Sequence, residues 1–190
     1  MRIKLLMLTL AVACTFAGNA RALTKVEYKT QKDVIASDYK ANRGKCSVLK
    51  ANAKDICMSE AKGIENVAKA ELTAQYEPSV KHTQKLGMAR ADAAYDTAKE
   101  RCDDLSGNAK DVCIKDAKVA YVKAKEDAKV ARASADTTNT KAQKMVTVIK
   151  EANEEKREAQ YKAAKERCDI FAGAVKDTCQ NDAKAKFGMK

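Results

Sequence analysis

Apolar residues recur every three or four positions along most of the chain, which is the spacing of one face of an α-helix. One series alternates steps of three and four through Met88, Ala91, Tyr95, Ala98, Cys102 and Leu105. A second steps by four, four and three through Ala109, Cys113, Ala117, Ala120, Ala124, Ala128 and Ala131. Alanine dominates both seams, so each helical turn buries little apolar surface. The pattern predicts an all-α fold with a thin core.

The motif Tyr-x6-Cys-x10-Cys-x3-Ala-Lys occurs three times, at 39–62, 95–118 and 161–184. Between its cysteines each copy has residues that tolerate a left-handed backbone and that often stop a helix: Ala51-Asn52, Gly107-Asn108 and Gly173-Ala174. Each copy therefore predicts a helix, a tight turn and a second helix. We also expect Asn108 to cap the second helix of its copy.

These signals predict three antiparallel helical hairpins, at 23–78, 79–137 and 138–190. Proline suits a first helical turn but not a helix interior, so Glu77-Pro78-Ser79 should separate the first two hairpins. The capping residues 136–140 should separate the last two. The expected helices lie near 25–50, 53–76, 79–106, 109–135, 140–172 and 174–187.

Six cysteines belong to the repeat: Cys46, Cys57, Cys102, Cys113, Cys168 and Cys179. If each copy bends, both of its cysteines lie about 7.5 Å from the turn on facing helices, where a disulfide can form. If one helix ran through the copy, the two cysteines would be roughly 16 Å apart and could bridge only to another molecule. We expect three local disulfides, each stabilising its hairpin.

The segment 1–22 has the pattern of a secretory signal peptide, with Arg2 and Lys4 before an apolar run and a small-x-small site ending at Ala22. Its removal takes away three basic residues and no acid, lowering the formal net charge from +11 to +8. We therefore expect a soluble periplasmic protein. A lipid anchor at Cys14 is the alternative, because the residues before it loosely resemble a lipobox.

The sequence offers no catalytic, cofactor-binding or metal-ligating set, so we expect no enzyme and no cofactor. His82 is the single histidine and is interpreted as a surface residue. Serine nucleophile, glycine-rich phosphate-binding and His-Glu-x-x-His motifs are absent from the sequence. Ten residues between paired cysteines fit neither a zinc site nor a Cys-x-x-Cys redox pair.

Tyr39, Tyr95 and Tyr161 each precede a cysteine by seven residues and so share its helical stripe. We interpret them as the large residues of an alanine core, with ligand stacking as the alternative. The positive charge permits binding of lipopolysaccharide, anionic lipid or another polyanion. Because acids and bases are interspersed, a solvated surface is the other interpretation.

The segments Tyr-x-x-Ala-Lys-Glu-Arg-Cys-Asp at 95–103 and Gly-Asn-Ala-Lys-Asp-Val-Cys at 107–113 resemble a family of small exported proteobacterial proteins. Members are often labelled cell envelope biogenesis proteins similar to TolA. The resemblance covers nearly the whole chain after residue 22 and implies a periplasmic location without a known activity. We therefore expect a structural or interaction protein whose partner is an envelope protein or an anionic envelope component. A stress-type chaperone or a polyanion-binding protein is the alternative, and no specific nucleic acid is expected.

Overall fold

The computed structural model describes residues 23–135 and 141–189. The expected signal segment with Cys14, and the expected break at 136–140, lie outside these ranges. The elements are α1 (Lys25–Cys46), α2 (Ala51–Tyr76), α3 (Val80–Cys102), α4 (Gly107–Ala135), α5 (Lys141–Arg167), a short 3-10 turn η1 (Cys168–Ile170) and α6 (Gly173–Phe187).

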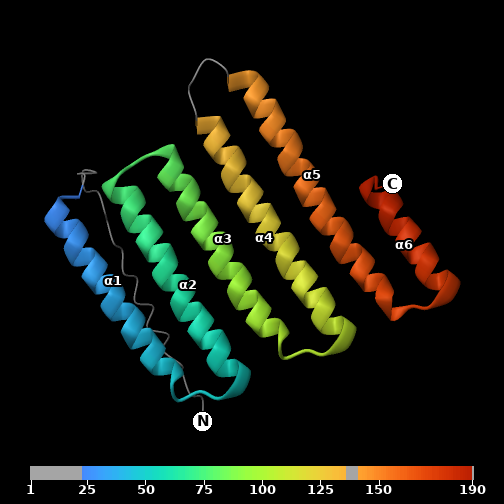
Figure 1. Ribbon diagram of the computed structural model, residues 1–190, viewed down its shortest axis with the longest axis horizontal. Coiled ribbons are helices and arrows are strands. Elements are labelled where there is room, and N and C mark those ends of the chain that lie inside the picture. The colour runs from blue at the N-terminus through green and yellow to red at the C-terminus, as the bar shows by residue number, and fades with distance from the viewer. Residues whose placement is uncertain (1–22, 136–140, 190) are drawn as a thin grey trace, which may run out of the picture.

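The helices lie side by side in one antiparallel layer, with α1 at one edge and α6 at the other (Figure 1). Each helix packs mainly against the helices before and after it in the chain. The three disulfide-containing bends gather at one end of the layer, while the α2–α3 connection lies at the opposite end (Figure 1). The expected all-α fold of three stapled hairpins is confirmed.

Local capping sets two of the helix starts. The Thr24 side chain accepts from the Glu27 backbone N–H, while the Glu27 carboxylate accepts from the Thr24 N–H, completing a capping box for α1. Ser79 caps α3 by accepting from the His82 N–H. His82 Nδ1 contacts the Glu77 carbonyl at 2.6 Å, so this side chain closes the α2–α3 connection. The predicted break at 77–79 is confirmed.

The bends differ from the expected helix ends. The first helix of each hairpin stops about four residues early, at Cys46 and Cys102, and at Arg167 before the turn η1. The left-handed residues Ala51 (φ 48°), Gly107 (φ 55°) and Gly173 (φ 55°) begin the second helices rather than ending the first. An extended residue precedes both Ala51 and Gly173, so the chain reverses before these residues and not at them.

A disulfide ties the two helices of every hairpin beside its bend. The bonds are Cys46–Cys57, Cys102–Cys113 and Cys168–Cys179, with Cα–Cα distances of 5.6, 5.7 and 5.7 Å. Cys46, Cys102 and Cys168 are also the largest side chains that are fully buried in the described part of the chain. The covalent bonds therefore occupy the best-packed points of a layer whose other buried apolar residues are mostly alanines.

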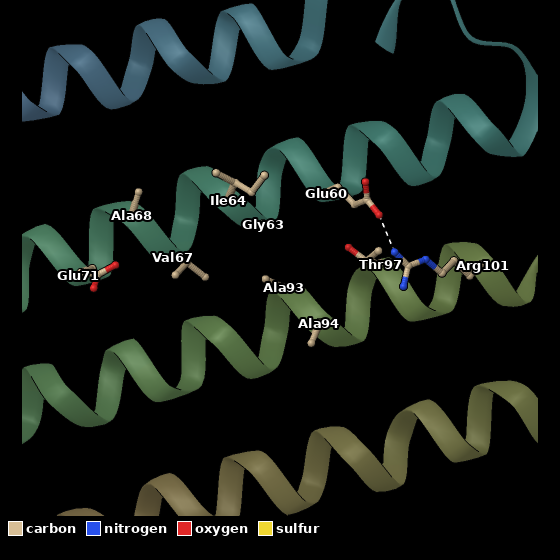
Figure 2. A pocket seen from close by; sticks show the side chains of 10 residues that line it. All are labelled: Glu60, Gly63, Ile64, Val67, Ala68, Glu71, Ala93, Ala94, Thr97 and Arg101. Carbon is tan, nitrogen blue, oxygen red and sulfur yellow. Dashed lines mark hydrogen bonds and ion pairs between the residues drawn. The ribbon is translucent and has the colours of Figure 1, made fainter. Parts of the chain in front are cut away.

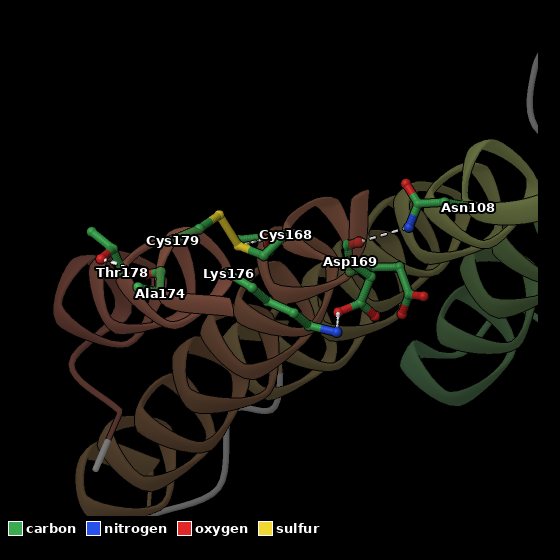
Figure 3. Close-up of a disulfide and its surroundings, with 9 residues drawn as sticks. Asn108, Cys168, Asp169, Ala174, Lys176, Thr178 and Cys179 are labelled. Carbon is green, nitrogen blue, oxygen red and sulfur yellow. Dashed lines mark hydrogen bonds and ion pairs between the residues drawn. A yellow bond between two sulfur atoms is a disulfide. The ribbon is translucent and has the colours of Figure 1, made fainter. Parts of the chain in front are cut away.

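Asparagine side chains join one hairpin to the next. Asn52 Nδ2 donates to the Glu100 carbonyl at 2.7 Å, and Asn108 Nδ2 donates to the Glu166 carbonyl at 3.0 Å. Both acceptors are in the last turn of a helix, where carbonyls lack intrahelical partners. The expected cap role of Asn108 is wrong, because this residue is already inside α4 and its side chain reaches across to the third hairpin (Figure 3).

Ion pairs cross the same two junctions at equivalent repeat positions. They are Glu60–Arg101 and Glu71–Arg90 between α2 and α3, and Asp116–Arg167 and Asp127–Lys156 between α4 and α5. Exposed pairs of this kind contribute little stability individually. Because these ion pairs and the asparagine hydrogen bonds occur at equivalent positions in both junctions, neighbouring hairpins pack in the same register at each junction.

At the two outer edges of the layer, some of the side chains that join neighbouring hairpins are replaced by other residues. Ala174 stands at the third-hairpin position of Asn52 and Asn108. Val34, on α1, stands at the position that Arg90 and Lys156 occupy in the later hairpins, and it is 52% exposed. A further hairpin packed against either edge in the same way would therefore lack one of the hydrogen bonds or ion pairs that join the three hairpins.

Replacing Cys102 and Cys113 with alanine should lower the free energy of unfolding by about 3 kcal/mol, since the disulfide closes a short loop and limits the unfolded chain. Urea unfolding monitored by circular dichroism measures the change. The variant should respond less to a reducing agent than the parent protein. An unchanged unfolding midpoint would contradict the stabilising role of this bond.

Asn108→Ala should lower the free energy of unfolding by about 1 kcal/mol, because the Glu166 carbonyl loses a hydrogen bond across the junction. Thermal and urea unfolding measure this loss. Ala174→Asn provides the matched control, since it places the same side chain at an edge position and should change stability by less than about 0.5 kcal/mol. Equal effects at the two positions would contradict a junction role for Asn108.

Candidate interaction surfaces

Close approach of α2 and α3 forms the first junction. At Gly63 an added Cβ would lie 2.8 Å from the Ala93 Cβ, so the absence of a side chain permits this spacing. Ser59 and Thr97 hydroxyls lie 3.4 Å apart one turn away. Small residues therefore bring the two backbones together, and larger side chains project from the layer on either side.

An apolar groove follows this junction on one face of the layer, which we call the groove face (Figure 2). It has a volume of about 610 Å³, and Ile64, Val67, Ala68, Ala93 and Ala94 form its apolar lining. Ile64 is 58% exposed at its rim. The junction ion pairs Glu60–Arg101, at 2.6 Å, and Glu71–Arg90, at 3.6 Å, flank the groove.

A second groove occupies the equivalent place between α4 and α5 and extends to α6. Asp116 and Arg167 replace the pair Glu60–Arg101, and Val119 stands at the position of Gly63. Its volume is also about 610 Å³. The groove face thus repeats one arrangement, an apolar floor beside charges that neutralise each other.

The opposite face, which we call the tyrosine face, carries cations over aromatic rings. Residues two apart on a helix point about 200° apart, so Lys62 and Ile64 project from opposite sides of the layer. Lys62 Nζ and the Arg43 guanidinium lie 5.1 and 5.5 Å from the Tyr39 ring centroid. The second hairpin repeats this around Tyr95, with Lys118 at 5.2 Å and Lys99 at 5.9 Å.

Three further tyrosines, Tyr28, Tyr76 and Tyr121, extend the aromatic contacts inside these hairpins. Tyr28 stacks on Tyr76 with ring centroids 4.3 Å apart, and Tyr95 lies 4.9 Å from Tyr121. Burial, followed by a hydrogen bond to Asp92, raises the pKa of Tyr121 above its ordinary value. These four tyrosines are half-buried, and a lysine lies over the rings of Tyr28, Tyr95 and Tyr121.

Glu65 is a buried carboxylate within the first hairpin, with 6% of its surface exposed. Lys62 donates to it at 2.8 Å and Lys69 at 2.6 Å. These two hydrogen bonds hold the pKa of Glu65 below its ordinary value despite its burial. Glu65 and Lys69 stand at the i, i+4 spacing of a helical ion pair, while the burial of the carboxylate depends on how the helices pack.

The structure shows where the residues that the sequence analysis singled out are located. All six repeat cysteines are in disulfides, and Tyr39, Tyr95 and Tyr161 are half-buried. Within residues 23–135 and 141–189, no three His, Cys, Asp or Glu side chains are placed to hold a metal ion. In the same residues, no helix is both long and apolar enough to span a bilayer. The linking roles of Asn52 and Asn108 were missed by the sequence analysis.

Comparison with protein-family models, curated proteins and solved structures finds no match for this chain.

The buried position of Glu65 predicts a specific pH dependence. Its folded-state pKa is lowered, so its charged form stabilises the fold above its ordinary pKa of 4.5, and this stabilisation is lost as pH falls through the folded-state value. Urea unfolding of Glu65→Gln and the parent protein from pH 7 to pH 2 measures the effect. The difference in stability should be largest near neutral pH and shrink below about pH 4.5. A difference that is constant with pH would show that ionisation of Glu65 does not contribute.

Proposed function

We propose that this protein is a non-enzymatic structural or interaction protein of the periplasm, which presents its helical layer to components of the cell envelope. The observation that carries this proposal is the single layer of helices, in which none of the described helices lies over either broad face. The two faces differ in chemistry, since one has apolar grooves between paired charges and the other has cations over tyrosines. An array of this form is suited to binding extended partners.

The disulfides support placement outside the cytoplasm, because such bonds form and persist in oxidising compartments. Polar side chains between the hairpins are used for holding helices together: the two asparagines bond to carbonyls, and the junction charges form pairs. The resemblance of the repeats to exported envelope proteins points the same way.

Binding of an anionic envelope component is a second candidate function, and the charges on the tyrosine face favour it. Arg101 and Arg167 on the groove face pair with acids across the junctions. On the tyrosine face, Arg43, Lys99 and Lys118 lie over rings, and none of these cations forms an ion pair with a described residue. Such cations are free to meet an anion from outside the molecule.

Site-specific photo-crosslinking in living cells tests the proposed function. A photoreactive amino acid at Ile64 samples the groove face. The same photoreactive amino acid at Lys40, which lies beside Tyr39, samples the tyrosine face. We expect discrete adducts with envelope components from at least one face, together with recovery of the protein in the periplasmic fraction. A probe at buried Ala61 controls for nonspecific labelling. Recovery in the cytoplasm, or no adduct beyond the Ala61 control at either face, would contradict the proposal.

A further inference from the structure

The first hairpin has a groove beside its disulfide that carries positive charge. Its lining consists of Tyr39, Lys40, Arg43, Gly44, Ser47, Lys54 and Met58, and its volume is about 480 Å³. Tyr39 and Met58 provide an apolar floor, and three cations lie around it. Among the described residues, none of these three cations has a carboxylate within ion-pair distance.

In each of the other two hairpins, an aspartate stands at the position of Ser47 and pairs with the lysine at the position of Lys54. Lys110 pairs with Asp103, and Lys176 pairs with Asp169, both at 3.0 Å, beside the disulfides of their hairpins. Figure 3 shows the second of these pairs next to Cys168–Cys179. In the first hairpin the equivalent lysine is Lys54, but the position of the aspartate is taken by Ser47.

The same exchange occurs along the first helix of the hairpin. Gly44 stands where the other copies have Glu100 and Glu166, and Lys40 stands where the second copy has Asp96. Counting the seven equivalent positions, the formal charge is +3 in the first hairpin, −1 in the second and +1 in the third. The three sets are Tyr39, Lys40, Arg43, Gly44, Ser47, Lys54, Met58; Tyr95, Asp96, Lys99, Glu100, Asp103, Lys110, Ile114; and Tyr161, Lys162, Lys165, Glu166, Asp169, Lys176, Gln180.

Neither backbone conformation nor steric crowding requires glycine at position 44. Gly44 is inside α1, and a Cβ there would meet no atom within 4 Å. A side chain would fit, and glycine destabilises a helix interior relative to alanine. The residue leaves the groove open and removes the carboxylate that the other copies carry.

Exposed apolar residues adjoin the groove at the bend. Val48 is 81% exposed and Leu49 is 39% exposed, and they follow Ser47 directly. Basic residues beside an exposed apolar tip match the surface of an anionic bilayer, where phosphates lie above the acyl region. We propose that the first hairpin binds anionic phospholipid membranes, with Lys40, Arg43 and Lys54 contacting lipid phosphates and Val48 and Leu49 entering the acyl boundary. This inference rests on the proposed envelope function and names its partner.

Vesicle co-sedimentation of the purified, disulfide-bonded protein tests the inference. Vesicles of phosphatidylglycerol with phosphatidylethanolamine should bind the protein in a salt-dependent manner, while phosphatidylcholine vesicles should not. The triple variant Lys40→Gln, Arg43→Gln, Lys54→Gln should weaken binding by roughly tenfold or more. The matched control Lys162→Gln, Lys165→Gln, Lys176→Gln changes the equivalent residues of the third hairpin, has the same net charge, and should bind like the parent protein.

A second variant adds acids without removing any cation. Gly44→Glu with Ser47→Asp introduces the carboxylates of the other copies at positions where they fit the fold, and it should also weaken vesicle binding. Circular dichroism and the unfolding midpoint establish that each variant is folded. Equal loss in the first-hairpin and third-hairpin triple variants would overturn the site, because net charge alone would then explain binding.

The source of the phosphate is tested with inorganic phosphate and soluble polyphosphate as competitors. Inorganic phosphate at millimolar concentration should leave vesicle binding intact, whereas Val48→Gln with Leu49→Gln should weaken it. Binding of polyphosphate without binding of anionic vesicles would overturn the membrane assignment. Because these assays use purified protein, their failure would leave any face-specific crosslinking in cells, and with it the proposed function, unaffected.

Discussion

The structure depends on joining helices that bury little surface against one another. In a single layer, each helix has neighbours on at most two sides, and here most of the buried apolar residues are alanines. Alanine contributes little hydrophobic free energy, so the layer needs other interactions to hold the helices in register. Disulfides meet this need within each hairpin, and asparagine bonds with ion pairs meet it between hairpins.

The same constraint explains how the two faces acquire different chemistry. The junction charges on the groove face pair across the hairpins, and the cations on the tyrosine face rest on aromatic rings. Because no element of residues 23–135 and 141–189 forms a second layer over either face, charge that is not used for linking stays available to solvent and partners. The first hairpin accentuates this difference. Gly44 and Ser47 stand there in place of acids found in both other copies, and Lys40 in place of an acid found in the second copy.

Much of the hairpin architecture was predictable because its interactions are local. The cysteines of each pair are 11 residues apart, and a bend between them leaves one sterically reasonable partner for each thiol. The details of the bends were less predictable. A left-handed glycine can end one helix or begin the next, and in Gly107 and Gly173 the second arrangement occurs, which shortened the preceding helices relative to expectation. Asn108 was misassigned for the same reason, because a capping residue and a cross-hairpin donor have the same local sequence.

The sequence by itself determined the helical class, the three repeats and the positions of the covalent ties, because periodicity and short spacing express these directly. Only the tertiary structure decided which helices of different hairpins pack together and which side chains meet across them. Asn108 and Glu166 are 58 residues apart, and their contact depends on the register of whole hairpins rather than on any local pattern. The tertiary structure also decided on which face of the layer each charged residue lies. Helical spacing shows which residues share one side of a helix, but only the packing of the helices shows which side is exposed to solvent.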